Sequence, residues 1–147
     1  MIDHAGYRLK LIAESFQRLV ARPLVMGQDD VAQSLWRAPF VIVAHGTEPD
    51  PIFFFGNKLA LDLFETSPAA FAAMPSRLSA EQELRQERAK LMARVTRDGY
   101  IDDYSGIRIS ATGRRFRIQN AIVWNLVDKD GRLHGQAATF SDWTPIG

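Results

Sequence analysis

The chain has 147 residues, 46% of them hydrophobic and 24% charged, which is the composition of an ordinary globular protein long enough to bury a core. Its 18 basic and 17 acidic residues leave a net charge of +1, so no general attraction to nucleic acid or anionic membranes is expected. The absence of cysteine excludes disulfides, thiolate zinc sites, a cysteine nucleophile and a flavin–cysteinyl photoadduct. The chain start has no signal-peptide pattern and no apolar run could span a bilayer, so we expect a cytoplasmic protein.

Two helices are predicted at the start of the chain. Apolar residues at helical spacing between Leu9 and Val20 form one face, and Pro23 should end that helix. Asp30 followed by Gln33 fits a capping box that opens a second, short helix through Trp36. We therefore expect residues 1–38 to form an N-terminal helical extension.

The middle of the chain is predicted to form a hairpin followed by helices. Residues 40–45 and 52–55 are apolar and flank turn residues, which is typical of two short strands. Asn57 is placed to cap a helix over residues 59–64, and one helical turn is expected around residues 69–73. Ser79 with Gln82 forms a further capping box, for a helix that Gly99 should end.

From Tyr100 onward the sequence predicts strands over residues 101–110, 114–127 and 133–143. The turns between them fall at Thr112-Gly113 and at residues 128–131. Strands joined by hairpins imply an antiparallel sheet. The expected fold class is therefore α+β, with a five-stranded antiparallel sheet over residues 39–147, helices on one face, and the helical extension before it.

Several stretches resemble the PAS superfamily. They are DPIFFF at 50–55 leading to Asn57, SATGRRF at 110–116 and FSDW at 140–143. More narrowly, the chain is similar to the MEKHLA-domain family, a PAS-like group, and to its stand-alone bacterial type. The stretches that carry this second resemblance are PSRLSAE at 75–81, GYIDDYSGIR at 99–108 and AIVWNL at 121–126.

The resemblance implies a sensory or protein-interaction module in signalling, with a pocket between sheet and helices. It supplies no catalytic residues and specifies neither ligand nor cofactor. A bound ligand or partner would shift the packing of sheet and helices, and a separate effector protein would receive the signal.

The longest predicted strand and the last one provide the candidate ligand site. Strict alternation over residues 114–127 puts Asn120 and Trp124 on one face, the expected core face. Gln136 and Phe140 share a face of the last strand, so Asn120, Trp124, Gln136 and Phe140 are expected to form a pocket wall suited to a planar ligand. The ordinary alternative is that these amides bond to neighbouring backbone or water and hold no ligand.

Other polar residues give weaker candidates. None of the three histidines has metal-ligand spacing, so no metal is expected, and His45 is a backbone-bonded histidine more often than a haem ligand. Asp103 or Tyr104 could serve as the acid or base of a small-molecule enzyme. Adjacent strand residues face opposite ways, so Asp102 and Asp103 cannot easily share a site, and Asp102–Ser105 more often shapes a bulge or forms salt bridges. The basic stretch 113–117 is expected to be a solvated strand face and no nucleic-acid site.

The apolar stripe of the first helix must be buried somewhere, because a short helix is marginal alone. It can fold onto its own sheet or pair with a second copy of the chain. We favour a homodimer, with Leu9, Ile12, Phe16 and Leu19 in the interface. A ligand-free homodimeric interaction module is therefore the remaining alternative to the sensory and enzymatic functions.

Overall fold

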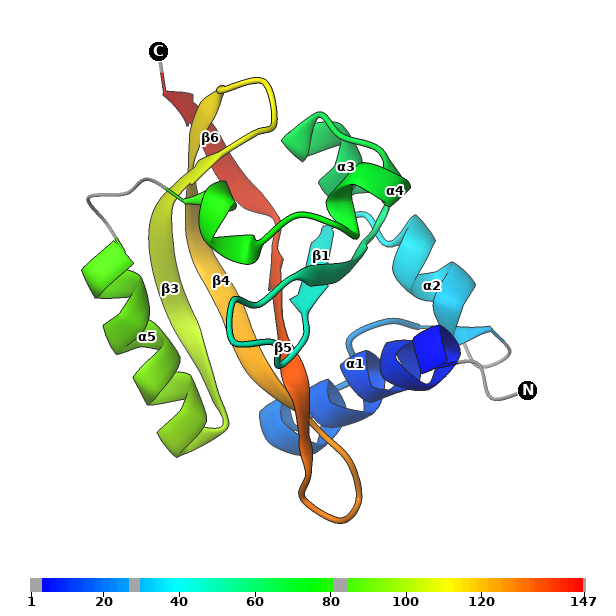
Figure 1. The fold of residues 1–147 in the computed structure, drawn as a ribbon. Coiled ribbons are helices and arrows are strands. Elements are labelled where there is room, and N and C mark those ends of the chain that lie inside the picture. The colour runs from blue at the N-terminus through cyan, green and yellow to red at the C-terminus, as the bar shows by residue number, and fades with distance from the viewer. Residues whose placement is uncertain (1–3, 27–29, 81–84, 147) are drawn as a thin grey trace.

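The computed structural model describes residues 4–26, 30–80 and 85–146. Its centre is an antiparallel sheet in the order β2-β1-β5-β4-β3, with β6 added to β4 (Figure 1). The strands are β1 (Val41–His45), β2 (Phe53–Gly56), β3 (Tyr100–Ile109), β4 (Arg115–Val127), β5 (Leu133–Phe140) and β6 (Asp142–Ile146). The α+β fold class with an antiparallel sheet is confirmed.

The last predicted strand is divided in two. The chain turns at Ser141, so that β5 and β6 pair with successive parts of β4. β5 pairs with β4 from Ile122 to Val127, and β6 pairs with β4 from Arg115 to Gln119. Asn120 lies between the two pairings, in the left-handed region with φ 56°.

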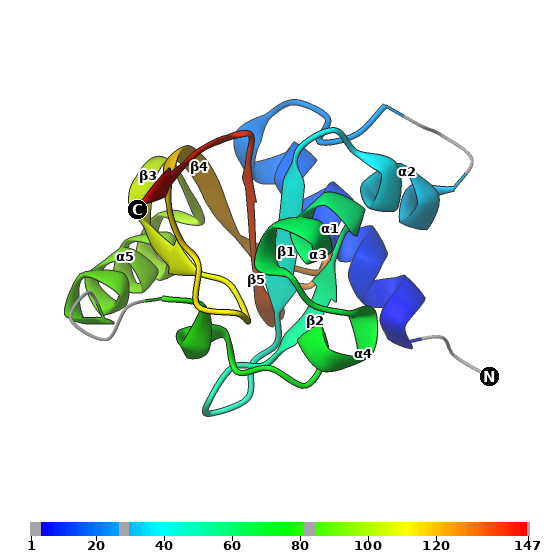
Figure 2. The same ribbon diagram turned by 90° about the horizontal axis from the view of Figure 1, so that it is seen from above.

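The helices cover both faces of the sheet. On one face lie α3 (Lys58–Phe64), α4 (Pro68–Phe71), the 3-10 turn η1 (Ser76–Ser79) and α5 (Arg85–Asp98). On the other lie α1 (His4–Val20) and α2 (Val31–Arg37). Figures 1 and 2 show α5 and α1 at opposite sides of the strands. The central helices thus cover one face as predicted, and the N-terminal helices cover the other.

Local sequence signals account for most helix boundaries. Asp30 caps α2 by accepting a hydrogen bond from the Gln33 N–H at 3.1 Å, and Asn57 caps α3 through the Ala60 N–H at 3.1 Å. α5 ends before Gly99, whose φ is +89°. The predicted capping box of Ser79 and Gln82 involves residues outside the described ranges. Ser79 itself ends η1 and donates to Ser76 O at 2.7 Å.

The apolar stripe of α1 is buried within its own chain. Ile12 and Phe16 have no exposed surface and pack against Trp124 and Leu126 on the sheet. The Phe16 ring meets Trp124 edge-on at 4.8 Å between centroids, and the indole Nε1 donates to Ile12 O at 3.2 Å. Ile12 and Phe16 are therefore not available to a second copy in this structure. Of the four residues expected in a dimer interface, Ile12 and Phe16 are thus buried in cis, whereas Leu9 and Leu19 are partly buried. Dimerisation through α1 stays a prediction that would have to use the partly buried residues.

The helices of the described ranges include none that is long and apolar enough to cross a membrane.

Candidate functional site

A partly enclosed cavity of about 50 Å³ lies between the sheet and helices α3 and α5. A space of this size holds a ligand of only a few atoms, much less than a flavin or a haem. Most of its wall is apolar, from both the strands and the helices. The apolar wall includes Val43, Phe64, Leu91, Ile118, Val123 and Ala138.

A wider groove of about 470 Å³ lies next to the cavity. His45, Met92 and Gln136 line both spaces, so these three side chains stand between the enclosed cavity and the open groove. The groove runs between α5 and the loop after β1, and its volume is that of an ordinary small-molecule site.

Gln136 is the polar residue of the predicted wall that the structure does place at the cavity. Its Nε2 donates to Asn125 Oδ1 at 2.9 Å, and Asn125 Nδ2 in turn donates to Val95 O at 3.0 Å. This amide pair joins β5, β4 and α5 directly behind the cavity wall. The sequence interpretation had Asn125 on the opposite face and so missed it.

The structure brings only part of the predicted wall together. Gln136 and Phe140 line the cavity, whereas Asn120 is exposed on the surface and Trp124 faces α1. The placement of Asn120 and Trp124 on the cavity wall was wrong. The reason is a bulge in β4 that ends the strict alternation on which the prediction rested.

The register of β3 and β4 shows this bulge. Tyr104 pairs with Ala121 and Gly106 with Ile118, so β4 has one more residue than β3 in this interval. Gln119 and Asn120 are consecutive and both exposed, which a regular strand on a covered sheet does not allow. Beyond the bulge, Ala121, Val123 and Asn125 face the cavity side, and Trp124 and Leu126 face α1.

The two candidate acid or base residues lie in different surroundings. Asp103 is exposed and its Oδ1 lies 3.4 Å from Arg94 Nη2, while Tyr104 turns inward and lines the cavity. The ladder is irregular between Ile101 and Tyr104, so the bulge and the salt bridge suggested by the sequence at Asp102–Ser105 are both present. Among the described residues, no group of three or more His, Cys, Asp or Glu side chains could hold a metal ion. His45 Nδ1 lies 2.9 Å from Gly46 O, as expected for a backbone-bonded histidine.

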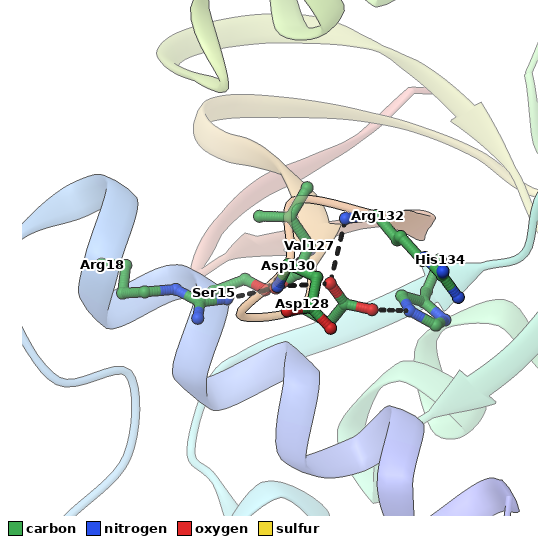
Figure 3. A network of polar contacts seen from close by, with 7 residues as sticks. All are labelled: Ser15, Arg18, Val127, Asp128, Asp130, Arg132 and His134. Atoms are coloured by element: carbon green, nitrogen blue, oxygen red, sulfur yellow. Dashed lines mark hydrogen bonds and ion pairs between the residues drawn. The ribbon is translucent and has the colours of Figure 1, made fainter.

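A polar network fastens α1 to the turn between β4 and β5 (Figure 3). Ser15 is fully buried, and its hydroxyl donates to Val127 O at 3.0 Å and accepts from Val127 N at 2.9 Å. Arg18 donates to the same carbonyl. Within the turn, Asp128 accepts from His134 Nε2 at 2.9 Å. The face of the sheet opposite the cavity is thus tied to α1 at the end of the strands that line the cavity.

The Asp128 carboxylate should make folding stability depend on acid pH. The hydrogen bond from His134, and then those from the N–H groups of Arg132 and Asp130, hold its pKa at about 2, below the usual 3.8. A carboxyl with a lowered folded-state pKa stabilises the protein above its unfolded pKa, and this stabilisation is lost as pH falls towards about 2. We expect Asp128→Asn to flatten part of the fall in unfolding free energy below about pH 4, measured by urea unfolding at a series of pH values.

Asp130→Asn is the control for that experiment, because it removes a charge from the same turn and leaves the bonds to the Asp128 carboxylate in place. An acid limb of equal steepness in the wild type and in Asp128→Asn would contradict the assigned role of Asp128.

Comparison with known proteins shows the family of this chain. The sequence model of the MEKHLA domain family matches residues 7–145, nearly the whole chain. The chain belongs to the MEKHLA domain family. Among curated relatives, the homeobox-leucine zipper protein REVOLUTA of Arabidopsis thaliana is 27% identical over 124 residues, which are 81% of this chain and 15% of that protein. The chain thus spans under a fifth of the length of that relative.

Two solved structures show the fold of this MEKHLA domain. A PAS domain from Colwellia psychrerythraea superposes with a TM-score of 0.65 at 13% identity, over 78% of this chain and 92% of that one. A PAS domain of a LuxR-family transcriptional regulator from Burkholderia thailandensis, in complex with ethanol, gives 0.60 at 15% identity, over 80% and 97%. The predicted PAS-like fold is confirmed.

Proposed function

We propose that this MEKHLA domain is a non-enzymatic sensory module that binds a small molecule between its sheet and helices α3 and α5. The observation that carries the proposal is the partly enclosed, mostly apolar cavity with Gln136 in its wall and a more open groove beside it. The mostly apolar lining is typical of small-molecule sites, and the small volume restricts the ligand to very few atoms. The ethanol complex of the Burkholderia thailandensis PAS domain supports this use of the fold for a ligand of very few atoms.

The contacts behind the cavity offer a route for the signal. A ligand that moves Gln136 would act on the Asn125 amide and so on Val95 of α5. On the opposite face, the same two strands contact α1 at two places. Trp124 of β4 donates to Ile12 O, and Ser15 and Arg18 donate to Val127 O at the start of the turn between β4 and β5. Ligand binding would then change the relative populations of α1 positions on the sheet.

Homodimerisation, an effector protein as partner and a cytoplasmic location remain part of this proposal. A dimer would have to use surfaces other than Ile12 and Phe16, which are buried in cis. The alternative is an enzyme with Asp103 or Tyr104 as acid or base. It is less favoured, because the Asp103 carboxylate faces solvent and pairs with Arg94, which leaves Tyr104 alone at the cavity.

The first experiment is native mass spectrometry of the freshly purified full chain, with an absorbance spectrum of the same sample. A retained small molecule is the expected result, and its mass identifies the ligand class. Protein without a bound molecule, combined with no shift of the backbone amides when 1-propanol or propionate is titrated into the sample, would contradict the proposal.

Filling the cavity should abolish binding. Ala138 lies in the cavity wall, and Ala138→Leu adds three carbon atoms to a space of about 50 Å³. We expect the chemical-shift changes that 1-propanol causes at the backbone amides of Val43 and Val123 to disappear in this variant. Ala111→Leu adds the same side chain in an exposed turn and should leave the titration unchanged. Equal titrations of Ala138→Leu and wild type would place the binding site elsewhere.

A further inference from the structure

Arg108 brings a positive charge to the mostly apolar cavity. It lies near the end of β3 and lines the enclosed space together with Tyr104 and Ile118. Its surface is partly buried, and the pKa of its guanidinium is lowered because burial removes water from the charge. A charged residue in such a wall is uncommon, since burying a charge costs free energy unless a partner compensates it.

The backbone of β3 holds Arg108 in this position. A Cβ on Gly106 would come within 2.3 Å of Tyr104 Oη, so the Tyr104 side chain lies across the space that a side chain at 106 would fill. The guanidinium of Arg108 then stacks over the Tyr104 ring, with its Cζ 5.2 Å from the ring centroid. The backbone of Arg108 also forms an isolated antiparallel β-bridge with Ala80. The aromatic face thus orients the cation along the cavity wall.

The guanidinium has no counter-charge within the described residues. The arginines that form ion pairs there are others: Arg77 with Asp50, Arg94 with Asp103, Arg97 with Asp98 and Arg114 with Glu65. Arg108 has neither an ion pair nor a side-chain hydrogen bond to any residue of 4–26, 30–80 or 85–146. Among the described residues, its planar set of N–H donors thus has no acceptor, and a carboxylate matches that geometry.

The rest of the wall limits what the anion can be attached to. Val43, Leu91 and Val123 offer only apolar contacts, and the enclosed volume of about 50 Å³ admits few atoms. Within the described residues, no group donates to Gln136 Oε1, which leaves one acceptor at the boundary with the groove. These features suit a short aliphatic acid better than a phosphate, which would bring several more polar oxygens into an apolar space.

We propose that the cavity binds a small organic carboxylate, with its carboxylate on the Arg108 guanidinium and its short apolar body against the strands. This inference rests on the proposed ligand-binding function and specifies its ligand class.

The test compares propionate with 1-propanol, which share a carbon skeleton and differ in charge. Both are titrated into the full-length protein, and the dissociation constants are taken from the shifts of the Val43 and Val123 amides. Arg108→Gln should weaken propionate binding by about 10- to 100-fold, the usual effect of losing hydrogen bonds to a charged group, and should leave 1-propanol binding unchanged. Arg108→Lys, which keeps a charge without the planar donors, should give an intermediate loss.

Arg117→Gln is the matched control, because Arg117 is exposed on β4 and its loss changes the net charge by the same amount. Binding of 1-propanol to Arg108→Gln also shows that this variant is folded. If Arg108→Gln does not fold, the comparison is made with Arg108→Lys. Suppose that 1-propanol binds and that propionate binds the wild type and the Arg108 variant with equal affinity. That result would overturn the carboxylate inference and leave the ligand-binding function standing. Failure of both probes to bind the wild type would overturn the ligand-binding function itself.

Discussion

Replacing Asn57 with alanine should lower the free energy of unfolding by about 3–6 kcal/mol, the largest loss expected from a single amide in this chain. The side chain is fully buried and makes four hydrogen bonds. Its Oδ1 accepts from the N–H groups of Ile42 and Ala60, at 3.2 and 3.1 Å. Its Nδ2 donates to Leu35 O and Phe40 O, at 3.1 and 2.8 Å.

The physical reason is that alanine leaves buried backbone groups without a partner. Each unsatisfied group costs about 1–3 kcal/mol, and the whole stability of a domain is about 5–15 kcal/mol. Asn57 therefore does more than cap α3, because it also joins the end of α2 to the start of β1. Equilibrium urea unfolding, followed by circular dichroism, measures the loss.

Ser67→Ala is the matched control for Asn57→Ala. Ser67 also caps a helix, accepting from the Ala70 N–H at 3.2 Å, but it is exposed and its side chain makes no bond to another element in the described ranges. Loss of this cap should cost only about 0.5–2 kcal/mol. Similar losses in both variants would mean that Asn57 acts as a cap only.

Phe16→Ala should cost about 3–5 kcal/mol, the usual effect of truncating a fully buried phenylalanine. Phe16 has no exposed surface, and its ring packs edge-on against Trp124 at the centre of the cluster between α1 and the sheet. Removing the ring leaves a cavity beside the largest side chain of the core. Urea unfolding at several protein concentrations is the measurement, and the loss should be independent of concentration, because the contact is made within one chain.

Gln17→Ala is the control, since it lies next to Phe16 on the same helix and its side chain is exposed. It should change the stability by less than about 0.5 kcal/mol. If Phe16→Ala had wild-type stability but a lower mass in light scattering, packing of α1 within one chain would be contradicted. The apolar stripe of α1 would then be a dimer interface.

Much of this MEKHLA domain follows from signals that are local in the sequence. The caps at Asp30 and Asn57 and the glycine after α5 act within one turn of backbone, so the residue types alone indicate where the helices begin and end. Short turns between strands likewise determine antiparallel pairing, and the residue strings of the PAS and MEKHLA groups led to the fold. The family match and the superpositions confirm both.

The site depended on contacts between distant residues, and strict alternation misplaced half of its predicted wall. The bulge at Asn120 arises from the pairing of β4 with β3 on one side and with β5 and β6 on the other, which no window of β4 reveals. A one-residue slip exchanges the faces of a strand, and it moved Trp124 to α1 and brought Asn125 to Gln136. The same holds for α1, whose periodicity showed that its stripe must be buried but not against which surface.

The sequence by itself thus determined the order and type of the elements, the helix caps and the fold family, because these depend on neighbouring residues. Only the tertiary structure decided which face of β4 lines the cavity, that α1 packs in cis, and that Arg108 reaches the cavity without a described counter-charge. Those properties depend on strand register and on packing between residues far apart in the chain, and both are set by the burial of the whole core at once.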